Sequence, residues 1–79
     1  MEYGFYVVSK FYDKGAVEAE VLTQEDALKR YPEIAAISGA AMEPPATVLM
    51  RTYDEHELYV DGFFSQDHAE EFAQESREA

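Results

Sequence analysis

The chain has 79 residues, contains no cysteine and has only 6 lysine or arginine residues. Without cysteine, neither a disulfide framework nor a thiolate metal site can support so short a chain, and a reducing, cytoplasmic setting is favoured. No apolar run approaches the roughly 18 residues of a membrane span, and no signal-like segment opens the chain. We therefore expect a soluble protein that is not secreted by a signal of its own.

The 6 basic residues are outnumbered by 17 acidic residues, which gives the chain a formal net charge of −11. Binding to nucleic acid or to an anionic membrane is disfavoured because both need lysine and arginine. The expected counterpart is a basic protein surface or a cation. The hydrophobic fraction of 47% is that of a folded chain, and the length allows one domain, residues 1–79.

The first half of the chain reads as two strands and a helix. Residues 3–12 are rich in aromatic and β-branched side chains, and residues 16–22 alternate between apolar and acidic, so both are predicted strands. Gly15 in the connection can adopt a positive φ. Thr23 is placed as an N-cap, and the helix is expected to run to Ser38 with a break near Pro32.

The second half repeats this order after a proline-containing loop at residues 39–45. Residues 46–53 and 58–64 are predicted strands around a polar turn. Ser65 is an N-cap candidate for a terminal helix with Ala69, Phe72, Ala73 and Ser76 along one side.

The halves 1–38 and 46–79 form a degenerate repeat, either from an ancestral duplication or because two hairpins obey the same capping rules. The sequence predicts an α+β fold of ββαββα order, a four-stranded antiparallel sheet with both helices packed on one face. The other face of the sheet is then expected to be open. Strand alternation would place tyrosines and carboxylates on it, beside Lys10, Arg51 and Tyr53.

We interpret this open face and the neighbouring polar turn as a docking surface for a basic partner, with tyrosines as anchors. The alternative is a solvated face whose charge keeps a small protein soluble, although −11 exceeds the roughly 2–8 that solubility requires. The candidate partner-binding residues are Tyr6, Tyr12, Glu18, Glu20, Asp54, Glu55, Glu57, Tyr59 and Asp61.

Catalytic chemistry has no signature in the chain. His56 and His68 lie near carboxylates, but they form no recognised zinc-ligand spacing, and we expect no metal site. The serines belong to no nucleophile motif, and the glycines form no phosphate-binding loop. We therefore predict a protein that is not an enzyme and has no cofactor.

The whole-chain profile, a short, strongly acidic, cysteine-free α+β domain with a tyrosine-rich sheet, resembles the small phage-encoded inhibitors, including anti-CRISPR and DNA-mimic proteins. The resemblance covers size and composition and includes no motif. It implies an inhibitor in the host cell cytoplasm that occupies a basic nucleic-acid-binding surface of a host complex. The alternative from another class is a self-associating adaptor domain, as a monomer or homodimer, with no role in mimicry.

Overall fold

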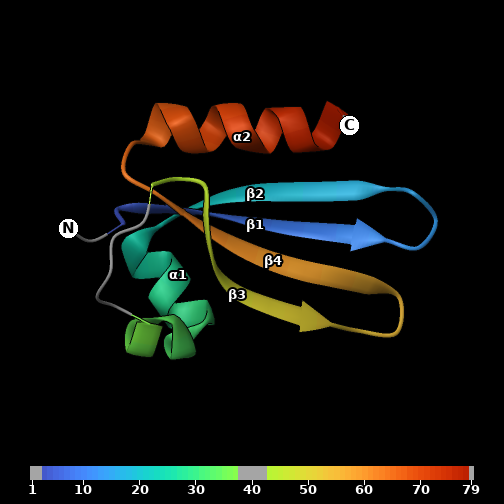
Figure 1. Ribbon diagram of the computed structural model, residues 1–79, viewed down its shortest axis with the longest axis horizontal. Coiled ribbons are helices and arrows are strands. Elements are labelled where there is room, and N and C mark those ends of the chain that lie inside the picture. The colour runs from blue at the N-terminus through green and yellow to red at the C-terminus, as the bar shows by residue number, and fades with distance from the viewer. Residues whose placement is uncertain (1–2, 38–42, 79) are drawn as a thin grey trace.

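The computed structural model describes residues 3–37 and 43–78 and has the predicted ββαββα order. The elements are β1 (Phe5–Tyr12), β2 (Val17–Thr23), α1 (Gln24–Arg30), the 3-10 helix η1 (Pro32–Ile37), β3 (Ala46–Thr52), β4 (His56–Phe63) and α2 (Gln66–Glu78). The strands form one antiparallel sheet in the order β2-β1-β4-β3 (Figure 1). The predicted α+β fold with a four-stranded antiparallel sheet is confirmed.

Local sequence signals explain where the elements begin and end. Gly15 adopts a φ of 93° in the turn between β1 and β2. The Thr23 hydroxyl accepts a hydrogen bond from the backbone N–H of Asp26 at 3.3 Å, and the Ser65 hydroxyl accepts one from that of His68 at 3.3 Å. Both predicted N-caps are therefore confirmed.

The predicted break near Pro32 is also present, because α1 stops at Arg30 and Pro32 begins the separate 3-10 helix η1. Proline at this position lacks the N–H that would continue the α-helical ladder. The predicted helix end at Ser38 and most of the loop that follows lie outside the described residues.

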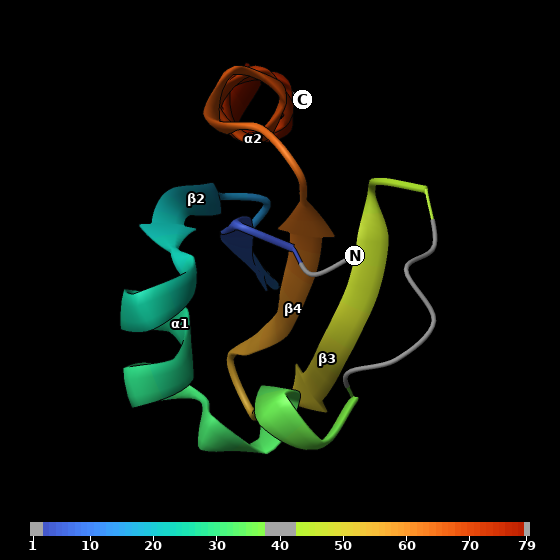
Figure 2. The same cartoon turned by 90° about the vertical axis from the view of Figure 1, so that its left-hand side faces the viewer.

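The helices lie on opposite faces of the sheet, and the prediction that both pack on one face is wrong (Figure 2). On one face, the residues of α1 and η1 pack in a first core. Its buried members are Tyr6, Val8, Leu22, Ala27, Ile34, Leu58 and Val60. On the other face, α2 packs in a second core whose buried members are Val7, Phe63, Ala69 and Ala73. The sheet therefore separates two hydrophobic cores.

The central strand β1 explains why both faces are covered. Four consecutive residues, from Tyr6 to Ser9, are buried, so apolar side chains leave this strand in both directions. A continuous run of this kind is typical of a strand that is buried on both sides, whereas strict alternation is typical of one open face. An uncovered sheet face would expose Val7 or Val8 to water.

Coverage by α2 is incomplete. This helix lies over β2 and β1 and leaves β4 and β3 largely uncovered on the same face (Figures 1 and 2). The two ββα halves thus differ in the face that their helices cover. The uncovered part of the α2 face is where the candidate site lies.

Candidate functional site

The predicted docking residues of β1 and β2 lie on the α1 face, where little of the expected surface remains. Tyr6 is only 7% exposed and belongs to the first core. Glu20 forms an ion pair with Arg30 of α1, with N–O distances of 3.0 and 3.2 Å. Glu18 is exposed and accepts a hydrogen bond from the Tyr12 hydroxyl at 3.3 Å. Tyr6 and Glu20 are therefore engaged by packing and by an ion pair, and Tyr12 and Glu18 are hydrogen-bonded to each other.

The predicted residues of β4 lie on the opposite face, so the expected single surface is wrong. Val8 is directly across from Glu20 in β2 and from Val60 in β4, which places Glu20 with Val60 and leaves Tyr59 and Asp61 on the other side. Alternation within each strand was predicted correctly, but the faces of different strands were matched in the wrong register. The remaining candidates, Asp54, Glu55 and Glu57, lie at or beside the exposed turn between β3 and β4.

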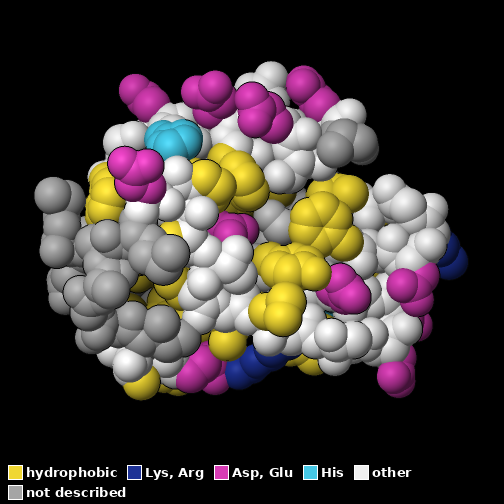
Figure 3. Space-filling model, in the orientation of Figure 1, with side chains coloured by type: hydrophobic (Ala, Val, Ile, Leu, Met, Phe, Trp, Pro, Cys, Tyr) yellow, Lys and Arg dark blue, Asp and Glu magenta, His cyan; other side chains and the backbone are white. Residues whose placement is uncertain are grey.

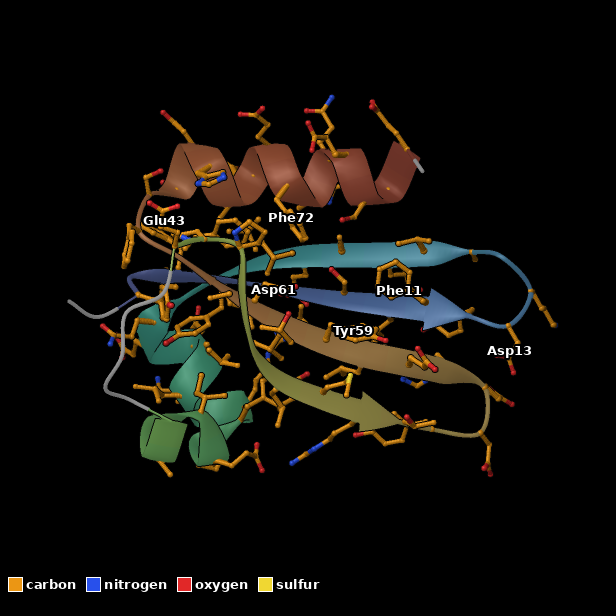
Figure 4. The ribbon with its side chains drawn as sticks, in the orientation of Figure 1. Phe11, Asp13, Glu43, Tyr59, Asp61 and Phe72 are labelled. Carbon is orange, nitrogen blue, oxygen red and sulfur yellow. The ribbon has the colours of Figure 1, made fainter. Side chains whose placement is uncertain are left out.

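A groove on the α2 face brings part of this set together with residues that were not predicted. It lies between α2 and β3 and has a volume of about 620 Å³. Its lining residues are Ser9, Phe11, Pro45, Thr47, Glu57, Tyr59, Asp61 and Phe72. Figure 4 shows Phe72 reaching down from α2 toward the sheet strands that carry Phe11, Tyr59 and Asp61. We call these eight residues the α2 groove.

Aromatic rings form the walls of the α2 groove. Phe11 and Tyr59 meet edge to face, with their ring centroids 5.5 Å apart. Phe72 packs against Phe63 of the second core at 5.2 Å, which holds its ring at the groove. Edge-to-face contacts leave ring faces available to a further group. The groove therefore offers preformed aromatic surface to a ligand.

Asp61 is the charged group at the floor of the groove and is only 6% exposed. The Thr47 hydroxyl donates a hydrogen bond of 2.6 Å to its Oδ1. Burial raises the pKa of the Asp61 carboxyl, and this hydrogen bond opposes the rise. Thr47 is the one donor found for this carboxylate among residues 3–37 and 43–78, and neither Asp61 oxygen is a buried atom without a partner.

Ser9 also lies at this floor and is 1% exposed. Its hydroxyl has no hydrogen-bond partner in the described part of the chain. A buried polar group without a partner costs about 1–3 kcal/mol. The groove floor thus combines the buried carboxylate of Asp61 with the buried hydroxyl of Ser9, which has no hydrogen-bond partner among the described residues.

Tyr59 and Glu57 are the polar residues at the mouth of the groove. The Tyr59 hydroxyl donates a hydrogen bond of 2.8 Å to Glu57 Oε2, and this bond is the main reason that the Tyr59 pKa is raised. A raised pKa keeps the Tyr59 phenol protonated at neutral pH, so its hydroxyl remains the donor to the Glu57 carboxylate. The mouth of the groove is therefore anionic.

A row of carboxylates runs along the exposed side of α2. Its members are Asp67, Glu70, Glu71, Glu75 and Glu78, all exposed. They span about 16 Å at 1.5 Å per residue. Figure 3 shows acidic side chains along α2 above a hydrophobic patch on the sheet. We call these five residues the α2 acidic row.

The α2 acidic row has no ion pair in the described residues. The three ion pairs found there join Lys29 with Glu25, Arg30 with Glu20, and Arg51 with Glu33. The single arginine of α2, Arg77, instead donates a 2.8 Å hydrogen bond to the backbone carbonyl of Ala19 in β2. None of the five carboxylates is therefore held in an ion pair in the described part of the chain.

The turns of the two hairpins lie side by side at the far end of the sheet, and this is a second place where predicted residues gather. The backbone N–H of Asp13 donates to the carbonyl of Glu55 at 3.1 Å. Glu55, Tyr12 and Glu18 line a hollow there together with Asp13 and Lys14. This hollow contains a lysine beside its carboxylates, so its charge is partly compensated.

The two histidines have aromatic neighbours. The His56 ring stacks on Tyr53 at 4.8 Å, and the His68 ring meets Phe63 edge to face at 4.9 Å. Within residues 3–37 and 43–78, no group of three or more histidine, cysteine or acidic residues is arranged to hold a metal ion.

Sequence reasoning missed Ser9, Phe11, Pro45, Thr47 and Phe72 of the groove, as well as the α2 acidic row. One signal was present: Asp67, Glu71 and Glu75 follow each other at i, i+4 spacing, which aligns side chains on a helix. The groove residues carried no such signal, because three strands and one helix contribute to it.

Comparison of the chain with protein-family models, curated proteins and solved structures finds no match. None of the helices within the described residues is long and apolar enough to cross a membrane.

Proposed function

We propose that this is a non-enzymatic acidic protein that binds a basic surface of a protein partner, of the kind that otherwise holds nucleic acid, and thereby inhibits that partner. The α2 acidic row carries the proposal. Its five carboxylates over about 16 Å correspond to one charge per about 4 Å, close to the 3.4 Å of axis per phosphate in one DNA strand. The site proposed is thus a helix flank rather than a sheet face.

The α2 acidic row destabilises the helix that carries it, and this loss of stability supports a role of the row in binding. Asp67, Glu71 and Glu75 are like charges at i, i+4 positions, which destabilise a helix by a few tenths of a kcal/mol per pair. Glu75 and Glu78 also lie near the negative end of the α2 dipole, where cations are favoured. A helix selected for stability and solubility alone would carry lysine or arginine at some of these positions.

Two variants with equal charge change test the proposal. The row variant combines Asp67→Asn, Glu71→Gln, Glu75→Gln and Glu78→Gln. The control combines Asp13→Asn, Glu18→Gln, Asp54→Asn and Glu55→Gln at the hairpin turns. Partners captured from a lysate by the wild-type chain would be identified, and their affinity for each variant and for nucleic acid would be measured at two salt concentrations.

We expect the row variant to bind at least tenfold more weakly than the control, and nucleic acid to compete with the wild-type protein for the partner. Binding of the wild type should weaken steeply as salt rises. Equal losses in both variants would show that only net charge matters. A partner that binds nucleic acid and this protein at the same time would contradict inhibition by occupancy.

Self-association is the second candidate function, and the edge strand β3 favours it. Its segment Ala46–Thr52 contains no acidic residue, and Met50 is 64% exposed. Arg51 is the single charged residue of this segment, and an edge strand with so few charges can pair with another copy. Sedimentation at two protein and two salt concentrations separates the candidates, because a homodimer of an acidic protein tightens as salt screens its self-repulsion.

A further inference from the structure

The floor of the α2 groove has a carboxylate with a single hydrogen bond and a hydroxyl that the described residues leave without a partner. Asp61 receives one hydrogen bond, from Thr47, and the Ser9 hydroxyl receives none from the described residues. Both side chains are more than nine-tenths buried. A floor that served packing alone would be better filled by apolar side chains, as at Val7 and Phe63 of the second core on the same face. The polar floor therefore indicates a ligand that brings donors.

The charged residues around the groove indicate which charge the ligand should carry. Asp61 lies at the floor, Glu57 at the mouth, and Glu71 and Glu75 on the flank of α2 that carries Phe72. No lysine or arginine is among the lining residues of the groove. The complementary ligand is a cation.

The aromatic residues of the groove indicate the shape of the ligand. Phe11, Tyr59 and Phe72 offer ring surface between the mouth and the carboxylate at the floor. Such a path fits a group with an apolar stem and a planar charged head, which can stack on a ring and form a cation–π contact. A small hydrated ion would leave these rings unused.

We propose that the α2 groove binds one arginine side chain of the basic partner, with its stem against Phe11, Tyr59 and Phe72 and its guanidinium at Asp61. Arginine fits better than lysine because its rigid fork of five donors can serve the Asp61 carboxylate and the Ser9 hydroxyl together. This inference rests on the proposed function and names the anchor of the same interface. The acidic row would attract the partner, and the groove would fix its position.

The test is an NMR titration of the ¹⁵N-labelled full chain with the peptide acetyl-Gly-Arg-Gly-amide. Two matched peptides carry citrulline, which is neutral and nearly isosteric, or lysine in place of arginine. A peptide this small should bind with a dissociation constant in the millimolar range, so the titration extends to about 20 mM. The amide signals of Ser9, Tyr59 and Asp61 report on the groove.

We expect saturating shifts at these signals with the arginine peptide, weaker binding of the lysine peptide and none of the citrulline peptide. Asp61→Asn should weaken binding of the arginine peptide at least fivefold, because the amide keeps an acceptor for Thr47 but lacks the charge. Ser9→Ala provides a second variant, expected to fold more stably and to bind more weakly. Glu55→Gln, at the distant turn, should leave binding unchanged.

Absence of arginine-dependent shifts at the groove, or equal binding by Asp61→Asn, would overturn the proposal. So would equal binding of the lysine peptide. Groove signals that change with protein concentration alone would instead identify a second copy as the occupant. If Asp61→Asn leaves capture of the basic partner intact while the row variant abolishes it, the groove assignment fails and the proposed function stands.

Discussion

Glu20 and Asp61 lie on opposite faces of the sheet, although both were expected on one docking surface. The register decides this, because Glu20 and Val60 share the central neighbour Val8, whereas Asp61 lies across from Val7. Glu20 is consequently paired with Arg30 under α1, and Asp61 is buried in the groove beside α2. The two carboxylates have different environments and should respond differently to substitution.

Asp61→Asn should stabilise the fold at neutral pH. Burial raises the pKa of Asp61, so the folded state holds the proton more tightly than the unfolded chain. The resulting stabilisation is complete below the unfolded pKa of about 3.9 and is lost as the pH rises through the folded pKa. The variant does not titrate and should therefore be more stable than the wild type by about 1 kcal/mol at pH 7.

Urea unfolding of both proteins from acid to neutral pH checks this. The stability difference between Asp61→Asn and wild type should grow as the pH rises above about 4 and then level off. Asp54→Asn removes an equal charge from an exposed turn and should show a much smaller change. A difference for Asp61→Asn that is independent of pH would contradict the assigned effect of burial.

Charge substitutions at the two ends of α2 should differ in their effect on stability. Glu75→Lys places a cation near the negative end of the helix dipole and removes a like-charge contact with Glu71, so it should stabilise by about 0.3–1 kcal/mol. Asp67→Lys also removes a like-charge contact with Glu71, but it places a cation at the positive end of the dipole, so its two effects should nearly cancel. Chemical denaturation at low and high salt measures both variants, and the difference between them should shrink at high salt. Equal stabilisation by the two substitutions would exclude the dipole explanation.

Gly62→Ala should destabilise the protein through contact with Tyr3. A Cβ at Gly62 would lie 2.6 Å from Cγ of the Tyr3 ring, whereas one at Gly4 has its nearest neighbour at 3.9 Å. Overpacking of this kind costs about 1–3 kcal/mol, and Gly4→Ala is the matched control. Urea unfolding should show the difference, and the cost of Gly62→Ala should fall in a Tyr3→Ala background. Equal costs at the two glycines would mean that the ring moves aside freely.

The signals that predicted the elements were local ones. The β-branched and aromatic run in β1, the glycine of the first turn and the capping hydroxyls of Thr23 and Ser65 each act over a few residues, and the structure confirms what they indicated. The run from Tyr6 to Ser9 also contained evidence of burial on both faces, which the prediction of one open face overlooked.

The amino-acid sequence alone determined the order of strands and helices, the caps, the strong negative charge and the antiparallel sheet, because each depends on neighbouring residues or on composition. Only the tertiary structure decided that α1 and α2 cover opposite faces and that Glu20 and Asp61 are separated. It also brought Ser9, Thr47, Tyr59 and Phe72 to one groove. These outcomes depend on the pairing register between strands distant in the chain and on where α2 packs, and no local pattern encodes either.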